Sequence, residues 1–229
     1  MVEAFGDGIW TADGPVVGGA AGFRFPTRMA ILKGPDGGLM LWSPVALTAS
    51  LKAGIEDLGE VRALVAPNTL HHVFLGAWQA ACPGAVTLAV PGLRDKRPDL
   101  RIDADLVGGP VKGWRDAVDL VIVTGNRLVT EAVLYHRASR TVLFVDLLQN
   151  FPAGWFTGWR GLVARLDLMV GDEPRVPRKF RVAMRDRAAA RSALERIRAW
   201  PAERVLMAHG DPIRENGRTR IEKAFAWLR

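Results

Sequence analysis

The stretch Arg62-Ala-Leu-Val-Ala-Pro-Asn-Thr-Leu-His-His72 decides the fold of this chain. Residues 62–66 are too short and too apolar for anything but a buried strand. The loop that follows ends in two adjacent histidines, His71 and His72. Neighbouring side chains point to opposite faces of a strand and diverge by about 100° on a helix, so this pair can share one metal ion only where the backbone is irregular.

The segments around this stretch alternate between strands and helices. Residues 73–82 predict a helix that Pro83-Gly84 ends, and residues 85–90 predict the next strand. Upstream, the apolar runs 27–33 and 39–42 flank a turn-rich segment and predict a hairpin, followed by a helix from Ser43-Pro44 to Leu58. Downstream we expect strands at 119–124, 131–135, 141–145 and 204–208 and a helix at 186–200. This order is typical of an α/β fold.

Composition limits the class of protein. The chain has 229 residues, of which 49% are hydrophobic, and no linker or repeat, so we expect one domain over residues 1–229. A single cysteine excludes a disulfide framework and indicates a reducing compartment. We find no signal peptide and no membrane span, and we expect a cytoplasmic protein without a membrane partner.

The net charge of +7 is unevenly placed. Residues 160–229 hold 17 Lys and Arg against 9 Asp and Glu, whereas the rest of the chain is nearly neutral. The simplest interpretation is a solvated, arginine-rich helix face. Nucleic-acid binding or processing is a weaker alternative, because charge alone, without interleaved aromatic residues, is poor evidence for it.

Candidate metal ligands follow three of the predicted strands. His71 and His72 come after the strand at 62–66, Asp146 after 141–145, and His209 after 204–208. Ligand sites of α/β folds gather at such strand ends, and imidazole with carboxylate is a ligand set for zinc, iron or manganese. Each residue also has an ordinary alternative: a helix cap or core packing for either adjacent histidine, a turn for Asp146, and a hydrogen bond to a backbone carbonyl for His209.

The order of β meander, histidine loop, hairpin, aspartate and late histidine resembles the metallo-β-lactamase superfamily over almost the whole chain. Within that superfamily it is similar to an uncharacterised branch with a degenerate HxHxDH motif. The resemblance implies an αββα four-layer sandwich, in which two mixed β-sheets lie back to back and are flanked by helices. It also implies a metal-dependent site at the strand ends.

The family motif is retained in one half only. If His72 takes the final histidine of HxHxDH, Pro67 and Thr69 stand where the first two histidines are expected. Gly125-Asn126 likewise stands in place of the family's Gly-His. These replacements bind a transition metal poorly, so the resemblance implies that the first metal site is lost.

The resemblance leaves the residues of the second site, His71, His72, Asp146 and His209, as metal ligands. We therefore expect one divalent ion, zinc or iron or manganese, or none, and not two. Such a ligand set leaves room for a water that the ion would acidify, with Asp146 as ligand and catalytic proton acceptor.

Other residues are expected to surround this centre. Asn68, Asn126 and Asp211 are candidates for orienting the ligands, although Asp211 before Pro212 is also typical of a turn. The segment 150–159 is rich in aromatic residues, and Trp155, Phe156 and Trp159 predict a pocket wall or lid, an apolar patch for a homodimer, or core packing. Glu131 begins a strand and is interpreted as an exposed strand end, with an acid that supports the ligands from behind as the alternative, and His136 is interpreted as a solvated turn residue.

Two functions fit these observations. One is a mononuclear metal-dependent hydrolase of unidentified small-molecule substrate. The other is a metal-free binding or scaffold module that kept the fold and uses the pocket or the aromatic segment for a ligand or partner.

Overall fold

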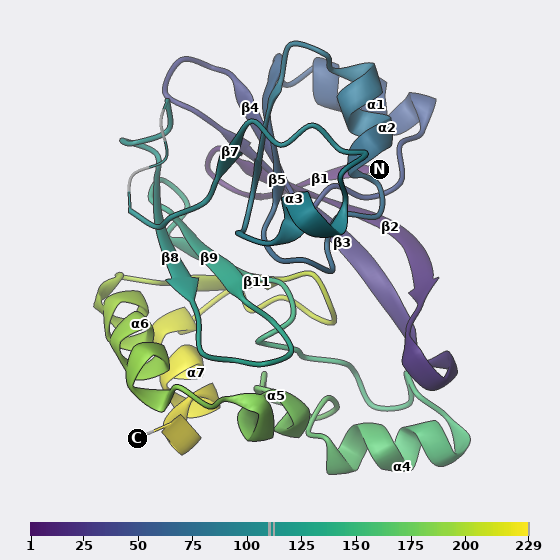
Figure 1. The fold of residues 1–229 in the computed structure, drawn as a ribbon, viewed down its shortest axis with the longest axis vertical. Helices are drawn as coiled ribbons and strands as arrows, with labels where there is room; N and C mark the ends of the chain where they lie inside the picture. Colours follow the sequence, from purple (N-terminus) through teal and green to yellow (C-terminus); the bar gives the residue numbers. More distant parts are fainter. Residues whose placement is uncertain (110, 112, 229) are drawn as a thin grey trace.

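A computed structural model describes residues 1–109, 111 and 113–228 of the chain. Two mixed sheets of seven and four strands pack face to face, with helices on their outer faces. In Figure 1, α1 and α2 lie at the upper right, α6 and α7 at the lower left, and the strands between them. The αββα sandwich expected from the sequence is therefore confirmed.

The first sheet has the strand order β1-β2-β3-β4-β5-β6-β7. Its first four strands form an antiparallel meander, and β4 to β7 pair in parallel. Its strands are β1 (Val2–Gly6), β2 (Ile9–Gly18), β3 (Arg24–Lys33), β4 (Leu39–Trp42), β5 (Val61–Ala66), β6 (Val86–Ala89) and β7 (Ala104–Asp105). The helices of this half are α1 (Ala49–Glu56), α2 (Leu75–Ala81) and α3 (Leu93–Lys96), with a 3₁₀ turn at Ala20–Gly22.

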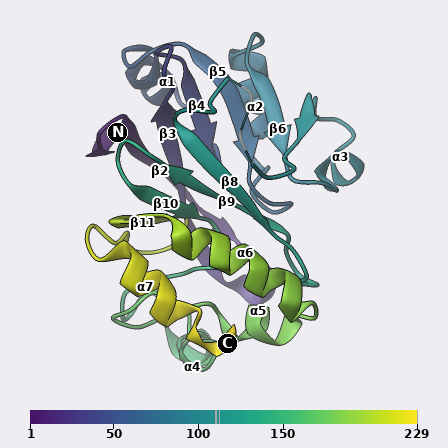
Figure 2. The ribbon, with the colours of Figure 1, turned by 90° about the vertical axis from the view of Figure 1, so that its left-hand side faces the viewer.

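The second sheet has the order β11-β10-β9-β8, in which only β10 and β11 are parallel. Its strands are β8 (Val118–Val123), β9 (Glu131–His136), β10 (Thr141–Phe144) and β11 (Arg204–Met207). The helices are α4 (Gly158–Leu166), α5 (Arg178–Ala183), α6 (Arg187–Ala199) and α7 (Gly217–Ala224), followed by a 3₁₀ turn at Ala226–Leu228. Figure 2 shows α6 crossing the outer face of this sheet.

Alternation along the strands separates three apolar layers. On β5, Ala63 and Val65 pack between the two sheets, whereas Leu64 packs under α1 and α2. On β10, Leu143 faces the first sheet and Phe144 faces α6 and α7. Since successive strand residues point to opposite faces, an uninterrupted apolar run is what a strand covered on both sides requires.

Several boundaries differ from the sequence-based prediction. The helix expected from Ser43 begins only at Ala49, where the Thr48 hydroxyl accepts the N–H of Leu51. Residues 67–74 are irregular, so α2 is shorter than the predicted helix. His136 is the buried last residue of β9 and not a solvated turn residue, so that prediction was wrong. Within the described ranges, no helix is long and apolar enough to cross a membrane.

Candidate metal centre

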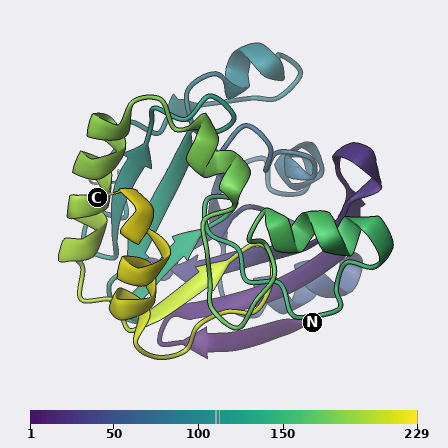
Figure 3. The ribbon, with the colours of Figure 1, turned by 90° about the horizontal axis from the view of Figure 1, so that it is seen from below.

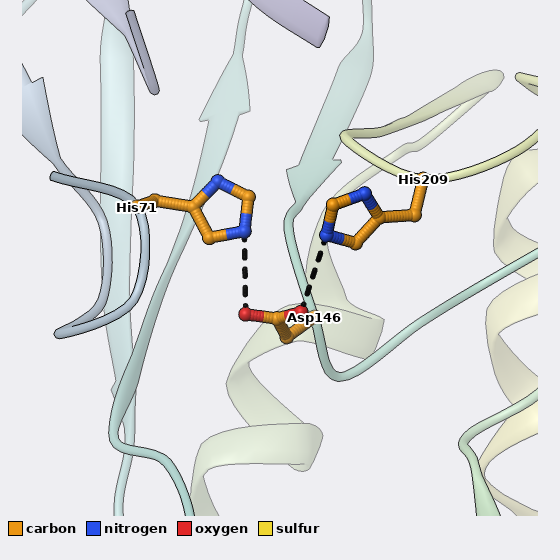
Figure 4. A group of neighbouring side chains, drawn as sticks. All are labelled: His71, Asp146 and His209. Carbon is orange, nitrogen blue, oxygen red and sulfur yellow. Dashed lines mark ion pairs between the residues drawn. The ribbon is translucent and has the colours of Figure 1, made fainter. Parts of the chain in front are cut away.

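Three loops, one from the first sheet and two from the second, bring His71, Asp146 and His209 together. They follow β5, β10 and β11, and one ligand atom from each residue lies within 4.8 Å of the others. Figure 4 shows both imidazoles directed at the carboxylate. The convergence depends on the sandwich, because the ends of β5 and β10 belong to different sheets.

Asn68 gives the first loop its irregular shape. Its Oδ1 accepts the backbone N–H groups of Leu70 and His71 at 2.8 and 2.9 Å, which is an Asx turn. Its Nδ2 donates to Asp146 Oδ2 at 2.7 Å. One buried amide side chain thus both turns the histidine loop and fixes the carboxylate.

Asp146 offers one oxygen to each histidine. His71 Nε2 lies 3.2 Å from Oδ2, and His209 Nε2 lies 3.3 Å from Oδ1. Burial would raise the pKa of Asp146, but the charges and hydrogen bonds of His71 and His209 hold that pKa well below its usual range. The carboxylate is therefore anionic at neutral pH.

The opposite ring nitrogens have partners of their own. His71 Nδ1 lies 2.7 Å from Ser43 Oγ, and His209 Nδ1 donates to the carbonyl of Pro26 at 2.7 Å. A carbonyl only accepts, so the neutral ring of His209 carries its proton on Nδ1 and presents a lone pair at Nε2. A lone pair facing a carboxylate is favourable only with positive charge between them, either a second proton on the ring or a cation.

Glu131 supports the backbone of the loop that carries Asp146. Its carboxyl group is fully buried at the start of β9 and accepts the N–H groups of Val145, Asp146 and Leu147 at 2.8–3.0 Å. Burial and the nearby Asp146 charge raise the pKa of Glu131 to about 8, against the three N–H donors, which lower it. The interpretation as an exposed strand end was wrong, and the alternative of an acid behind the ligands describes its position. Its signal in the sequence was a charged residue at the start of an otherwise apolar strand.

His72 does not join this group. Its Nδ1 accepts from Arg97 Nη1 at 2.7 Å, and Arg97 also binds Asp99. Burial, followed by the charges of Lys96 and Arg97, lowers the pKa of His72. The adjacent histidines therefore separate, and the structure brings together three of the four predicted ligands.

Two of the predicted orienting residues bind elsewhere. Asn126 donates to the carbonyl of Phe180 at 2.7 Å and accepts the N–H of Leu128, which ties β8 to α5. Asp211 is exposed, and its backbone pairs with Asn150. Only Asn68 of the three contacts a member of the group.

The aromatic segment reaches the centre indirectly. Phe25 and Phe151 lie against His209, with ring centroids at 5.4 and 6.2 Å. Phe156 packs against both rings, Trp155 lies tilted against Phe151 with ring centroids 6.1 Å apart, and Trp159 is exposed. Phe151 belongs to the aromatic segment expected near the site. Ser43, Pro26 and Phe25 also lie next to the imidazoles but could not be found from the sequence, because they are far from the motif along the chain.

Comparison with known proteins identifies the fold. No family model matches the chain, and no curated protein sequence does either. The metallo-β-lactamase FIM-1 from Pseudomonas aeruginosa in its mono-zinc form is 14% identical over 100% of this chain and 94% of its own, with a TM-score of 0.66. The metallo-β-lactamase from Pontibacter korlensis is also 14% identical, over 100% and 98%, with a TM-score of 0.65.

A third similar structure is the metal-soaked Flv1 flavodiiron core from Synechocystis, 13% identical over 100% of this chain and 60% of that one, with a TM-score of 0.67. At this level of identity the likeness concerns the fold. The chain has the metallo-β-lactamase fold, with a His/Asp group at the strand ends that could hold a metal ion.

Proposed function

We propose that this protein is a metal-dependent hydrolase that holds a single divalent ion with His71, Asp146 and His209. The observation that carries the proposal is the orientation of the His209 ring. Its Nδ1–H donates to the Pro26 carbonyl, so the neutral ring faces the Asp146 carboxylate with the lone pair of Nε2. A cation between them satisfies both groups. Fixing one imidazole nitrogen by a hydrogen bond so that the other is free for a metal is the usual arrangement of histidine ligands.

The donor set fits a catalytic ion. Two imidazoles and a carboxylate suit zinc, iron or manganese, and three protein ligands are typical of catalytic rather than structural zinc. When bound, such an ion supplies Lewis-acid polarisation of a substrate oxygen and acidification of water.

The protein's own residues hold and orient the centre. Ser43 and Pro26 orient the two imidazoles, and Asn68 and Glu131 fix the carboxylate and its loop. Because the pKa of Asp146 is held well below its usual range, this carboxylate is a poor proton acceptor. We therefore assign Asp146 the role of ligand and leave proton acceptance to the substrate or solvent.

A metal-free binding module is the second candidate, and the other half of the family motif favours it. The Pro67 carbonyl accepts the N–H of Ala132, the Thr69 carbonyl accepts from Lys96, and the Asn126 side chain joins β8 to α5. These positions serve the fold. In such a module, a proton on His209 Nε2 would supply the positive charge.

Elemental analysis of protein purified without chelator tests the metal. We expect about one equivalent of zinc, iron or manganese, and less than about a tenth of an equivalent would overturn the proposal. His209→Ala and Asp146→Ala should lose the metal. His72→Ala is the matched control and should keep the metal, because the His72 ring lies outside the group and bonds Arg97 instead.

Two further measurements separate the candidates. In the metal-free module, ¹⁵N NMR would show protons on both ring nitrogens of His209, with no change on adding chelator. For the hydrolase, we expect cleavage of at least one chromogenic ester, lactone, β-lactam or phosphodiester, lost in Asp146→Ala. Full metal content with no cleavage across this panel would reject the assigned reaction class and leave the metal site standing.

A further inference from the structure

The exposed apolar side chains of this protein gather on one face, formed by α4, α5 and the segments beside them. Of thirteen exposed large apolar residues in the described part of the chain, seven lie here, namely Leu128, Trp155, Trp159, Leu162, Val163, Leu166 and Val182. The other six are scattered over the chain, as single exposed apolar residues normally are. A gathering of this kind marks an interaction surface. We call it the α4 face.

The helix α4 presents its apolar side to solvent. Trp159, Leu162, Val163 and Leu166 follow i, i+3, i+4, i+7 spacing, which places them on one side of the helix, and they are 40–62% exposed. Ala164 is the one buried residue of the helix. At its start, Arg160 donates to the Ala21 carbonyl at 2.9 Å, and one edge of the half-exposed Trp159 ring contacts Phe23. A Cβ at Gly161 would lie 2.7 Å from the Phe156 carbonyl oxygen, so glycine permits this close approach.

A basic groove continues this apolar side. Between α4 and α5 lies an open groove of about 770 Å³, whose apolar lining includes Leu128, Leu166 and Val182. Its charged residues are Arg127, Arg178, Lys179, Arg185 and Asp167. Among described residues, Lys179 pairs with Asp167, and the three arginines form no salt bridge. The groove therefore carries a net positive charge.

We propose that the α4 face docks on an anionic bilayer surface, with α4 lying flat at the headgroup level. An apolar helix side bordered by arginine and carrying tryptophan is typical of interfacial helices, and basic residues beside it add attraction to anionic lipid. The Arg160 guanidinium lies over the Trp159 ring at 4.5 Å, which places a cation beside an amphipathic aromatic side chain.

The position of the face favours a bilayer over a protein partner. Figure 1 shows α4 at the lower end of the long axis, and Figure 3, viewed from below, shows α4 and α5 on the near side with no element over them. Projecting side chains enter a fluid headgroup layer without needing a shaped counterpart. A second copy meeting this face would bring together two grooves that each carry a net positive charge.

This contact requires no spanning segment, so it is compatible with the finding that no described helix could cross a membrane. The expectation of no membrane partner rested on the same absence, which says nothing about a helix lying on the surface. The α4 face shares no residue with the His71, Asp146 and His209 group, so the proposal stands whether or not a metal is bound.

Vesicle co-sedimentation with the full chain tests the proposal. We expect binding to vesicles of phosphatidylcholine mixed with phosphatidylserine, weak binding to phosphatidylcholine alone, and loss of binding at high salt. The fluorescence of the exposed tryptophans should shift to the blue on binding. Equal binding to both vesicle types would overturn anionic recognition, and absence of binding at low salt would overturn the proposal.

Exposed substitutions provide variants that retain the fold. Leu162→Asp with Leu166→Asp should weaken vesicle binding at least tenfold, and Arg178→Gln with Arg185→Gln should weaken it roughly thirtyfold. Val107→Asp, an exposed apolar residue elsewhere, is the matched control and should bind as the parent does. Circular dichroism verifies that all variants are folded.

Two outcomes would reassign the face. Dimerisation of the parent chain, detected by light scattering and abolished by the double leucine substitution, would assign the face to a second copy. Saturable binding of an acidic amphipathic peptide without vesicle binding would assign it to a protein partner. Either result overturns docking on lipid.

Discussion

The hairpin of β9 and β10 buries polar groups at both of its ends but pairs them differently. At the turn, His136 Nδ1 lies 2.8 Å from Ser139 Oγ, which donates to Thr141 Oγ1 at 2.8 Å. At the open end, Glu131 accepts the backbone N–H of Asp146. The Asp146 carboxylate in turn accepts a hydrogen bond from Asn68, which lies 78 residues earlier in the chain. The buried side chains of the turn bond one another, although Arg204 also donates to the Ser139 carbonyl at 2.6 Å. The buried side chains of the open end instead depend on partners from distant parts of the chain.

The difference separates a structural cluster from a candidate site. The polar side chains of the turn bond one another and call for no added charge. The open end places two imidazoles against one carboxylate, and the His209 ring is oriented so that a positive charge is needed. Both ends bury polar residues, so burial alone does not distinguish a candidate site from a structural cluster. The convergence of side chains that together require an added positive charge does distinguish them.

Glu131→Ala should cause the largest loss of stability, because it removes the acceptor of three buried N–H groups. At about 1–3 kcal/mol for each unsatisfied group, we expect the free energy of unfolding to fall by about 4 kcal/mol or more. Urea denaturation measures this change. Glu131→Gln keeps one acceptor oxygen and should lose about half as much; an alanine variant within about 1 kcal/mol of the parent would show that the open end needs no such support.

His136 predicts a pH dependence at the turn. Burial lowers the pKa of His136 to about 4 from 6.5, so the unfolded chain binds the proton first as pH falls. The contribution of neutral His136 to the free energy of unfolding is fully present above pH 6.5. It decreases by about 3 kcal/mol as pH falls to 4. Denaturation at several pH values, compared with His136→Gln, isolates it; parallel curves for the two proteins would contradict a buried neutral histidine.

Ser43 distinguishes orientation of the ligand from stability. Ser43 has φ of +56°, in the left-handed region, and its hydroxyl pairs with His71 Nδ1. Ser43→Gly relieves the backbone strain but removes the hydroxyl, so stability should change by less than about 1 kcal/mol while metal affinity falls about 10–100-fold. Chelator competition measures the affinity. Ser43→Ala keeps the strain, and an undiminished affinity in both variants would remove Ser43 from the centre.

Ser139→Ala should have the smallest effect, at the other end of the hairpin. It removes the partner of His136, and we expect a loss of about 1 kcal/mol in the free energy of unfolding. Metal content should not change, because no residue of the turn contacts His71, Asp146 or His209. A loss of metal in this variant would mean that the two ends of the hairpin are coupled.

The sheets and the strand ends could be predicted from the sequence, because short apolar runs between turn signals have few alternatives. Asp146 and His209 were placed correctly after their strands for that reason. The direction of each adjacent histidine could not be predicted. His71 turns inward because Asn68 bends the loop, and His72 is held outside by Arg97, which comes from the end of α3.

Other features were hidden for different physical reasons. Glu131 is buried only because three N–H groups from another strand end converge on it. The helix α4 reverses the usual rule, since its apolar spacing marks the exposed side and its small residues mark the buried one. A pattern that assigns apolar positions to the core cannot detect this reversal.

The hydrogen bond from His209 to the Pro26 carbonyl joins residues 183 positions apart. Contacts of such sequence separation form slowly, because a long loop must close first. During synthesis, the ribosome must release residue 209 before this bond can form, by which time the meander of the first sheet has long been available to fold. The centre is therefore completed late, and a cation captured there would be held by a nearly finished protein rather than by a nascent chain.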